Sequence, residues 1–181
     1  MATLPPSRDP RFNHLLDPYY NHIANPKYNR EINPDYNTVI NVRHNAEINP
    51  DYNYMMNPRR NATINYKYNP EINPNFNPNL NPKFNIEINP KFTIDIKADY
   101  LFNHSNRLTG IAVPVQSQEK SYILLYNLNL EFLAIAIGCN ENFYNVFDTD
   151  NDSVGFLIKT QIGFNIYDIQ NRWKAFIVNR Q

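Results

Sequence analysis

Apolar and polar positions alternate with a fixed period through the N-terminal half of the chain. Asparagine stands at every fourth residue from Asn21 to Asn89, and the residue before each asparagine is mostly apolar. Aromatic and aliphatic residues take turns there, so that two quartets make an octad of the form N-P-x-Y-N-x-x-I, as in residues 33–40 and 49–56. Asn13 and Asp17 extend the series, and His44 and Arg60 interrupt the apolar position. A period this regular identifies an internal repeat, which decides the architecture before any single residue does.

The repeat predicts turns, since helix and strand both conflict with it. Repeated prolines would remove donors from an α-helix at a cost of ~3 kcal/mol each, and a strand has a side-chain period of two. Asparagine followed by proline favours a turn. We therefore predict a coil of stacked turns over residues 13–98, with a ladder of asparagine hydrogen bonds and one apolar stripe. That stripe is expected to lie on the second half of the chain.

Two other interpretations of this segment exist. Asparagine- and proline-rich repeats are often unstructured, but a disordered segment has no need to keep both the asparagine and the apolar register. The Asn-Pro-x-Tyr strings also match peptides that phosphotyrosine-binding domains recognise. The repeat by itself accounts for those strings.

The second half repeats with a longer period. Segments 101–113, 125–137, 146–158 and 166–178 align without gaps, and each reads as strand, turn, strand. An Asx residue opens each turn, and a small residue follows in each second strand, at Gly110, Ala134, Gly155 and Ala175. We predict an all-β fold of four repeated β-hairpins closed into a shallow pseudo-four-fold ring or barrel, which removes exposed edges. The second strands are apolar at consecutive positions, so both of their faces are expected to be covered.

This pattern, with the close Trp173-Lys174-Ala175-Phe176, resembles the bacterial four-fold β-flower family over residues 99–181. The Asn-Pro-x-Tyr arm also resembles arms attached to some members. The resemblance implies a shallow pseudo-four-fold β structure with an apolar central channel. A loose likeness of that family to tubby-type lipid-binding barrels suggests a ligand. The chain departs from the family at Ala134 and Ala175, which replace glycine, and at Phe132, which replaces a more usual tryptophan.

The 181 residues divide into a flexible N-terminus over 1–12, the arm over 13–98 and the hairpin domain over 99–181. The formal net charge is zero, and neither half departs far from it. Without a basic stripe, nucleic acid is not an expected partner. No stretch reads as a signal peptide or a membrane span. Location is therefore left open, with the cytoplasm as the default.

No residues assemble into a recognisable catalytic or metal site. Cys139 is the only cysteine, so no intrachain disulfide forms, and a buried inert thiol is expected. The segment from Asp148 to Asp152 superficially resembles a calcium loop, but Ser153 stands where glycine is required and Lys159 where the acidic ligand is required. An acidic hairpin turn explains it better. We predict no enzyme activity and no cofactor.

One group of side chains is a candidate for ligand binding. An aromatic residue recurs at the end of each first strand, and a lone tryptophan closes the last segment. The candidate residues are Phe102, Tyr126, Phe147, Tyr167 and Trp173. Core packing is the competing explanation for a residue repeated four times.

The sequence thus predicts a non-enzymatic binding or structural module. The arm would be a spacer or scaffold, and the hairpin ring a recognition head for an unidentified protein or for self-association. The alternative is a carrier that holds a small apolar or lipid-like ligand in the central channel of the ring.

Overall fold

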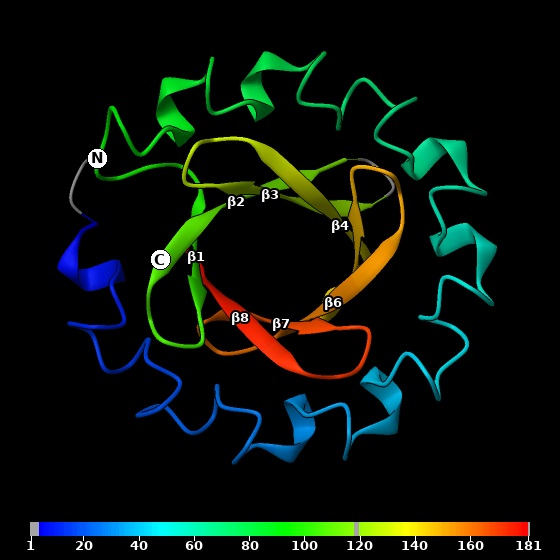
Figure 1. Ribbon diagram of the computed structural model, residues 1–181, viewed down its shortest axis with the longest axis horizontal. Helices are drawn as coiled ribbons and strands as arrows, with labels where there is room; N and C mark the ends of the chain where they lie inside the picture. Colours follow the sequence, from blue (N-terminus) through cyan, green and yellow to red (C-terminus); the bar gives the residue numbers. More distant parts are fainter. Residues whose placement is uncertain (1–3, 118–119, 181) are drawn as a thin grey trace.

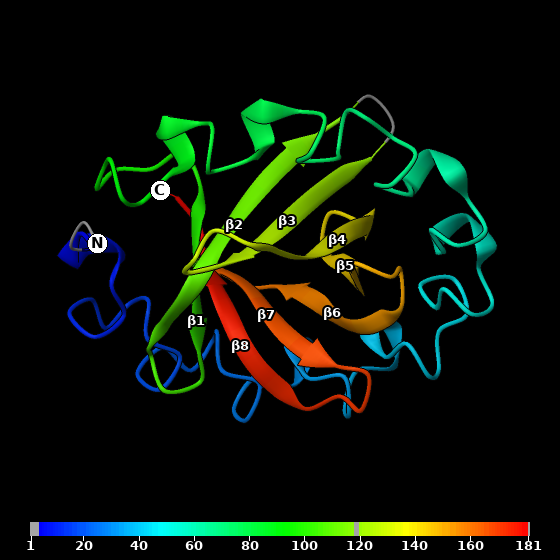
Figure 2. The same ribbon diagram turned by 45° about the horizontal axis from the view of Figure 1, so that its top comes forward.

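The second half of the chain is a closed barrel of eight antiparallel strands. In the computed structural model, which describes residues 4–117 and 120–180, each strand pairs with its neighbour in sequence and β8 closes on β1. The prediction of an all-β, closed fold is confirmed (Figures 1 and 2). The strands are β1 (Asp99–Asn103), β2 (Leu108–Gln116), β3 (Ser121–Asn127), β4 (Phe132–Asn140), β5 (Phe143–Asp148), β6 (Ser153–Lys159), β7 (Gly163–Asp168) and β8 (Trp173–Val178).

Four connections at one end of the barrel share one turn geometry; we call this end the tip end. In each, the Oδ1 atom of an Asx residue accepts the backbone N–H groups two and four residues later, as Asn103 does from Ser105 and Arg107. The residue three positions after the Asx has a positive φ, which is 57° at Asn106. Asparagine tolerates that conformation better than most residues. The three further turns are opened by Asn127, Asp148 and Asp168.

A β-bulge follows each of these turns at the same place. In the first hairpin Leu101 pairs with Gly110 and Phe102 with Leu108, so Thr109 is the extra residue. Leu133, Val154 and Lys174 are the corresponding extra residues in the other three hairpins. The small residues next to the bulges allow close approach, as predicted, since a Cβ added to Gly110 would lie 1.9 Å from the Tyr126 carbonyl oxygen. Bulges increase strand curvature and so help a short sheet to close.

Side chains fill the interior of the barrel. They form a cluster without any residue from the arm, in which alanines such as Ala112 and Ala136 lie opposite larger aliphatics. The rings of Tyr144 and Phe164 meet edge to face there, with centroids 5.3 Å apart. A ligand in this interior would have to displace packed side chains.

The arm encircles the barrel as a belt of turns (Figure 1). Residues 9–96 divide into consecutive octads, which we number from the asparagine that starts N-P-x-Y-N-x-x-I. Short 3-10 helices appear in many octads over positions 6–8. They are η2 (Arg30–Ile32), η3 (Thr38–Ile40), η4 (Tyr54–Met56), η5 (Ala62–Ile64), η6 (Pro78–Leu80) and η7 (Ile86–Ile88), with η1 (Pro6–Arg8) before the first octad.

Most of the repeat asparagines join two turns through their side chains. The Oδ1 atom caps the N–H two residues ahead, as Asn25 does for Lys27 at 2.9 Å. The Nδ2 atom reaches back to a carbonyl of the preceding octad. From position 1 the acceptor is seven residues back, as in Asn25 to Pro18 at 3.0 Å, and from position 5 it is six residues back, as in Asn29 to Ile23 at 2.7 Å. The predicted ladder is therefore one of side chain to backbone, which needs both an acceptor and a donor on the same residue.

The prediction of one apolar stripe is wrong, because the two kinds of apolar residue face opposite ways. The aliphatic residues at position 8 face the barrel: Ile64, Ile72 and Ile88 are 2%, 0% and 4% exposed. The aromatic residues at position 4 face outward: Tyr68, Phe76 and Phe84 are 74%, 70% and 72% exposed. Positions 4 and 8 are one four-residue turn apart, and their side chains point to opposite faces of the arm. Alternate apolar residues of the repeat therefore cannot form one stripe.

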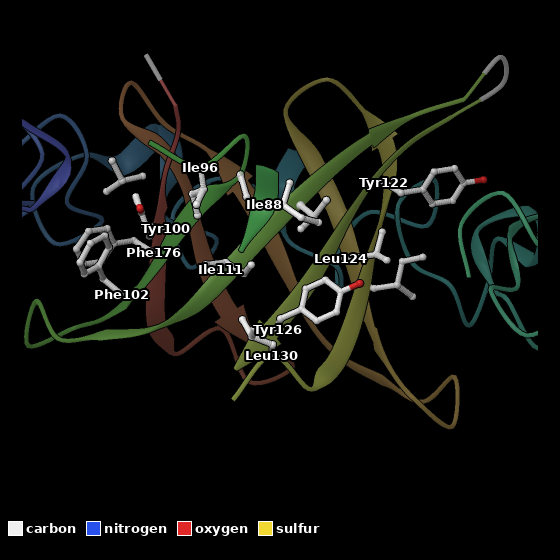
Figure 3. Packing of buried hydrophobic residues seen from close by; sticks show 14 of the residues in the cluster. Ile88, Ile96, Tyr100, Phe102, Ile111, Tyr122, Leu124, Tyr126, Leu130 and Phe176 are labelled. Carbon is white, nitrogen blue, oxygen red and sulfur yellow. The ribbon is translucent and has the colours of Figure 1, made fainter. Parts of the chain in front are cut away.

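The position-8 residues cover the outer wall of the barrel. Figure 3 shows Ile88 and Ile96 of the arm beside Tyr100, Ile111 and other barrel residues. A second cluster joins Ile32 and Ile48 to residues of β5, β6 and β7. The second strands are therefore covered on both faces, as their sequence predicts, and the arm is what covers the outer one.

Arg8 closes the belt. It stands at the place of a position-8 residue, and its Nη2 and Nη1 atoms donate to the carbonyls of Ala98 and Ile96 at 2.7 and 3.3 Å. Its guanidinium also lies 4.3 Å from the centre of the Tyr100 ring. The first and last octads of the arm thus meet beside β1.

The octad geometry begins earlier than the predicted boundary at residue 13. Arg8, Asp9 and Pro10 are buried, as are the equivalent residues of several later octads, such as 16–18 and 24–26. Of the predicted flexible segment, residues 1–3 lie outside the described part of the chain. Two residues of the connection between β2 and β3, 118 and 119, lie outside it as well.

Candidate functional site

Polar side chains of the barrel fix the arm in register. Tyr126 and Tyr167 donate their hydroxyls to the carbonyls of Leu80 and Ile32, each at 2.6 Å. Asn145 donates to Ile48 at 2.7 Å, and Asn165 to Ala24 at 2.9 Å. All four acceptors are position-8 carbonyls. Burial raises the pKa of both phenols, so they stay protonated donors at neutral pH.

The structure places four of the five predicted ligand-binding residues in this contact between barrel and arm. Phe102, Tyr126, Phe147 and Tyr167 are at most 2% exposed, and none belongs to the interior cluster. Their aromatic rings pack the outer wall, and two of their hydroxyls are bonded to the arm. The repeated aromatic position thus has a packing role, and ligand binding by these four residues stays a prediction.

Trp173, the fifth, lines a cavity between the arm and the β7–β8 hairpin. The cavity has a volume of about 370 Å³, and Tyr19, Tyr28, Tyr167 and the carboxylate of Asp35 line it together with the indole. Trp173 is half-buried, and its Nε1–H donates to the Ala175 carbonyl at 2.9 Å. Tyr167 and Trp173 are the predicted residues that the structure brings together. Sequence reasoning missed Tyr19 and Asp35, although both depart from the residue usual at position 3.

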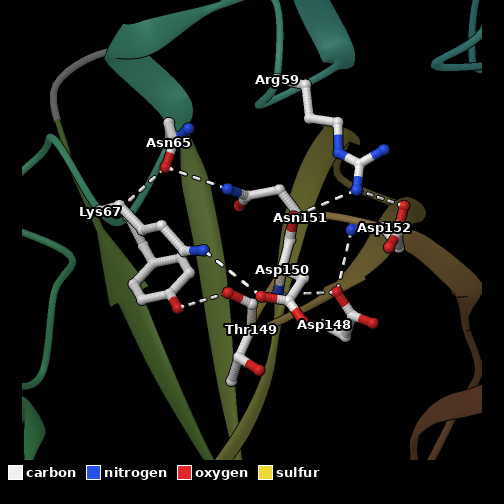
Figure 4. A network of polar contacts seen from close by, with 9 residues as sticks. Arg59, Asn65, Lys67, Asp148, Thr149, Asp150, Asn151 and Asp152 are labelled. Atoms are coloured by element: carbon white, nitrogen blue, oxygen red, sulfur yellow. Dashed lines mark hydrogen bonds and ion pairs between the residues drawn. The ribbon is translucent and has the colours of Figure 1, made fainter.

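The arm neutralises the acidic β5–β6 turn. Arg59 approaches Asp152 at 2.6 Å and Lys67 approaches Asp150 at 3.6 Å, while Asp148 accepts backbone N–H groups of its own turn (Figure 4). Tyr66 donates its hydroxyl to the Thr149 carbonyl at 2.8 Å in the same network. These carboxylates therefore bind the arm's cations and their own turn. Within the described residues, no group of three or more His, Cys, Asp or Glu side chains is arranged to hold a metal ion.

Cys139 lies near the opposite end of the barrel and is chemically quiet. Burial raises the pKa of its thiol to about 11, and Lys120 and an Asn145 amide 3.2 Å away offset this only in part. We expect the folded protein to react with Ellman's reagent at pH 7.5 more than ~10-fold slower than the same protein in denaturant, because the thiolate is the reactive form. Equal rates in the two states would contradict this placement of the thiol.

Most of the exposed large hydrophobic side chains of the described residues lie on the arm. We call its position-4 residues the aromatic row. Some of these rings pack on the residue six places earlier. The rings of Tyr20 and His14 are stacked with centroids 4.3 Å apart, and the guanidinium carbon of Arg30 lies 5.0 Å from the centre of the Tyr36 ring. Even so, the aromatic members remain more than half exposed. They are Phe12, Tyr20, Tyr28, Tyr36, Tyr52, Tyr68, Phe76, Phe84 and Phe92.

Charged rows run along the two edges of the belt. Position 3 is mostly basic, and Arg43, Arg59 and Lys67 contact the tip end of the barrel from there. Position 7 is acidic in several octads, and Glu71 borders a cavity with Ser117 near the β2–β3 connection at the other end. The aromatic row therefore lies between a basic edge and an acidic edge.

Comparison with protein-family models, with curated proteins and with solved structures finds no match to this chain. The resemblance to the β-flower family accordingly stays a hypothesis. In the part of the chain that the structure describes, no helix is long and apolar enough to cross a membrane.

Proposed function

We propose that the protein is a non-enzymatic binding and structural module that associates with further copies of itself through the outer face of its arm. In this proposal the barrel is the hub rather than the recognition head, because the arm already covers its outer wall. We also infer that the hub is pseudo-four-fold, since four Asx turns and four bulges occupy equivalent places. The observation that carries the proposal is the exposed aromatic row. Exposed aromatic side chains that recur along one face of a protein are typical of an interaction site.

Residues 65–92 form the best contact surface. Their aromatic members follow one another without interruption, and Tyr68, Phe76, Phe84 and Phe92 are 70–74% exposed. Phe12, Tyr20, Tyr28 and Tyr36 also follow one another without interruption, but they are less exposed, at 55–70%. His44 and Arg60 break the row on both sides of Tyr52. Aromatic side chains contribute large contact areas at low entropic cost and are enriched in interfaces.

Charge favours a second copy as the occupant of this surface. The formal net charge is zero, so two copies do not repel each other at long range. Lys83 and Lys91 lie on the basic edge of this arc, and Glu71 and Glu87 on the acidic edge. Two copies placed side by side in opposite directions bring each basic edge beside an acidic edge. That arrangement is a self-complementary, two-fold contact.

Sedimentation equilibrium tests the proposal. We expect the wild-type protein to dimerise, and the double variant Phe76→Ser/Phe84→Ser to dimerise at least ~10-fold more weakly because it loses two exposed rings. The matched control is Tyr36→Ser/Tyr52→Ser, which removes equally exposed rings outside the contact arc and should leave dimerisation unchanged. A wild-type protein that stays monomeric to ~100 µM, or equal loss in both variants, would refute self-association through this arc.

A further inference from the structure

Both internal repeats depart from their pattern at the cavity beside Trp173. Position 3 of the octad is charged in most units, but Tyr19 is aromatic there, and Asp35 is one of two acids among mainly basic residues. In the barrel, Trp173 replaces the leucine, phenylalanine or serine found at the equivalent place of the other hairpins, and it is the only tryptophan of the chain. These three residues line the same cavity. The usual repeat residues would be sufficient for packing at these positions. Because three departures from the repeats line one cavity, we infer that the cavity has a function of its own.

Aromatic rings form the wall of the cavity. The rings of Tyr19 and Trp173 have centroids 6.2 Å apart and are inclined by 49°, which opens a wedge between them. The Tyr19 hydroxyl donates to the His104 carbonyl at 2.7 Å, and the indole N–H is bonded to Ala175, so both rings are held from outside the cavity. Tyr19 is 50% exposed and Trp173 is half-buried, so both rings keep part of their surface open. The face of an aromatic ring attracts cations through its quadrupole, most strongly in tryptophan.

A carboxylate completes the site. The Oδ1 of Asp35 accepts a hydrogen bond from the Asn171 side chain at 2.9 Å, which ties the acid to the β7–β8 hairpin. Asp35 is exposed, and a carboxylate has lone pairs to spare after one such bond. The one cation on the cavity wall, Lys27, lies 5.6 Å from the centre of the Tyr28 ring, which is another lining residue.

We propose that this cavity binds a small organic cation, of the alkylammonium or quaternary ammonium class, between the Tyr19 and Trp173 rings with Asp35 as counter-ion. The volume of about 370 Å³ is sufficient for such a head group with a short polar tail. Lys27 stands at the rim as a like charge that weakens the binding of a cation. The site is separate from the 65–92 contact arc. Cation binding and self-association are therefore independent proposals, and either can fail without the other.

Trp173 provides the assay, because as the only tryptophan it reports on the cavity without labelling. We expect its emission to change saturably when choline is added. The neutral analogue 3,3-dimethylbutan-1-ol has the same shape without the charge and should bind at least tenfold more weakly. Asp35→Asn, which keeps the acceptor for Asn171, should weaken choline at least fivefold. Asp51→Asn, at the same octad position away from the cavity, should change nothing.

Lys27→Gln tests whether a like charge at the rim opposes the bound cation. If the cavity binds cations, removing the lysine strengthens choline binding severalfold. Unchanged or weaker choline binding in Lys27→Gln would overturn the proposal. So would the absence of a saturable change in Trp173 emission, equal affinity for the neutral analogue, or an unchanged affinity in Asp35→Asn.

Discussion

Replacing Ile72 by alanine is expected to lower the free energy of unfolding by about 2–5 kcal/mol, whereas Phe76→Ala should change it by no more than about 0.5 kcal/mol. The two residues are half an octad apart. Phe76 has the larger side chain, but its truncation should lower the free energy of unfolding less than that of Ile72. Ile72 is 0% exposed against the barrel, so its truncation leaves a cavity in a packed contact. Phe76 is 70% exposed on the outer face.

Equilibrium unfolding in guanidinium chloride measures this pair directly. Ile88→Ala and Phe84→Ala repeat the comparison further along the arm, with Ile88 at 4% and Phe84 at 72% exposed. Similar losses for aliphatic and aromatic positions would show that both kinds of residue pack on the barrel. The inward and outward division of the octad would then be wrong.

Arg8→Met is the second substitution with a large expected effect. Methionine keeps an unbranched apolar side chain at a position that is aliphatic elsewhere in the arm, but it is shorter than arginine and leaves the Ile96 and Ala98 carbonyls without the donors that Arg8 supplies. Hydrogen bonds to a charged group contribute about 1.5–3 kcal/mol each, and an unpaired buried acceptor adds a penalty. We expect a destabilisation of at least ~2 kcal/mol, with the octads nearest the N-terminus opening first.

Hydrogen exchange locates that opening. Amides of residues 9–24 should exchange faster in Arg8→Met while the strands of the barrel keep their protection. The control is Arg60→Met, because Arg60 is exposed at position 4 on the outer face of the arm. Equal exchange rates in Arg8→Met and Arg60→Met would mean that Arg8 does not close the belt.

Much of the architecture could be predicted from the sequence because two periodicities encode it. Asn-Pro turns at a period of four leave no room for helix or strand, and apolar runs on both faces of the second strands required a cover. The number of strands follows from four aligned segments. What the period of four concealed was the period of eight: one turn of four residues reverses the direction of the side chain, so Ile32 and Tyr36 could not face the same way.

The candidate site was harder to predict, because its residues are those that depart from the repeats. Phe102, Tyr126, Phe147 and Tyr167 stood out by recurring, and recurrence reflects their common task of packing against the arm. Tyr19 and Asp35 depart from the repeat and would have been found by asking which units break the pattern. Their proximity to Trp173 depends on how the belt is registered on the barrel, through bonds such as that from Tyr167 to the Ile32 carbonyl. No local sequence pattern specifies that register.

The arm runs once around the barrel, and its first and last octads meet. Spin labels at Phe12→Cys and Phe92→Cys, in a Cys139→Ser background, measure this closure, because both positions lie on the outer face at 70% and 73% exposure. We expect one narrow distance distribution at short distance, which Arg8→Met should broaden. A flexible segment of that length would give a broad distribution centred on the order of 50 Å, and that result would contradict a closed belt.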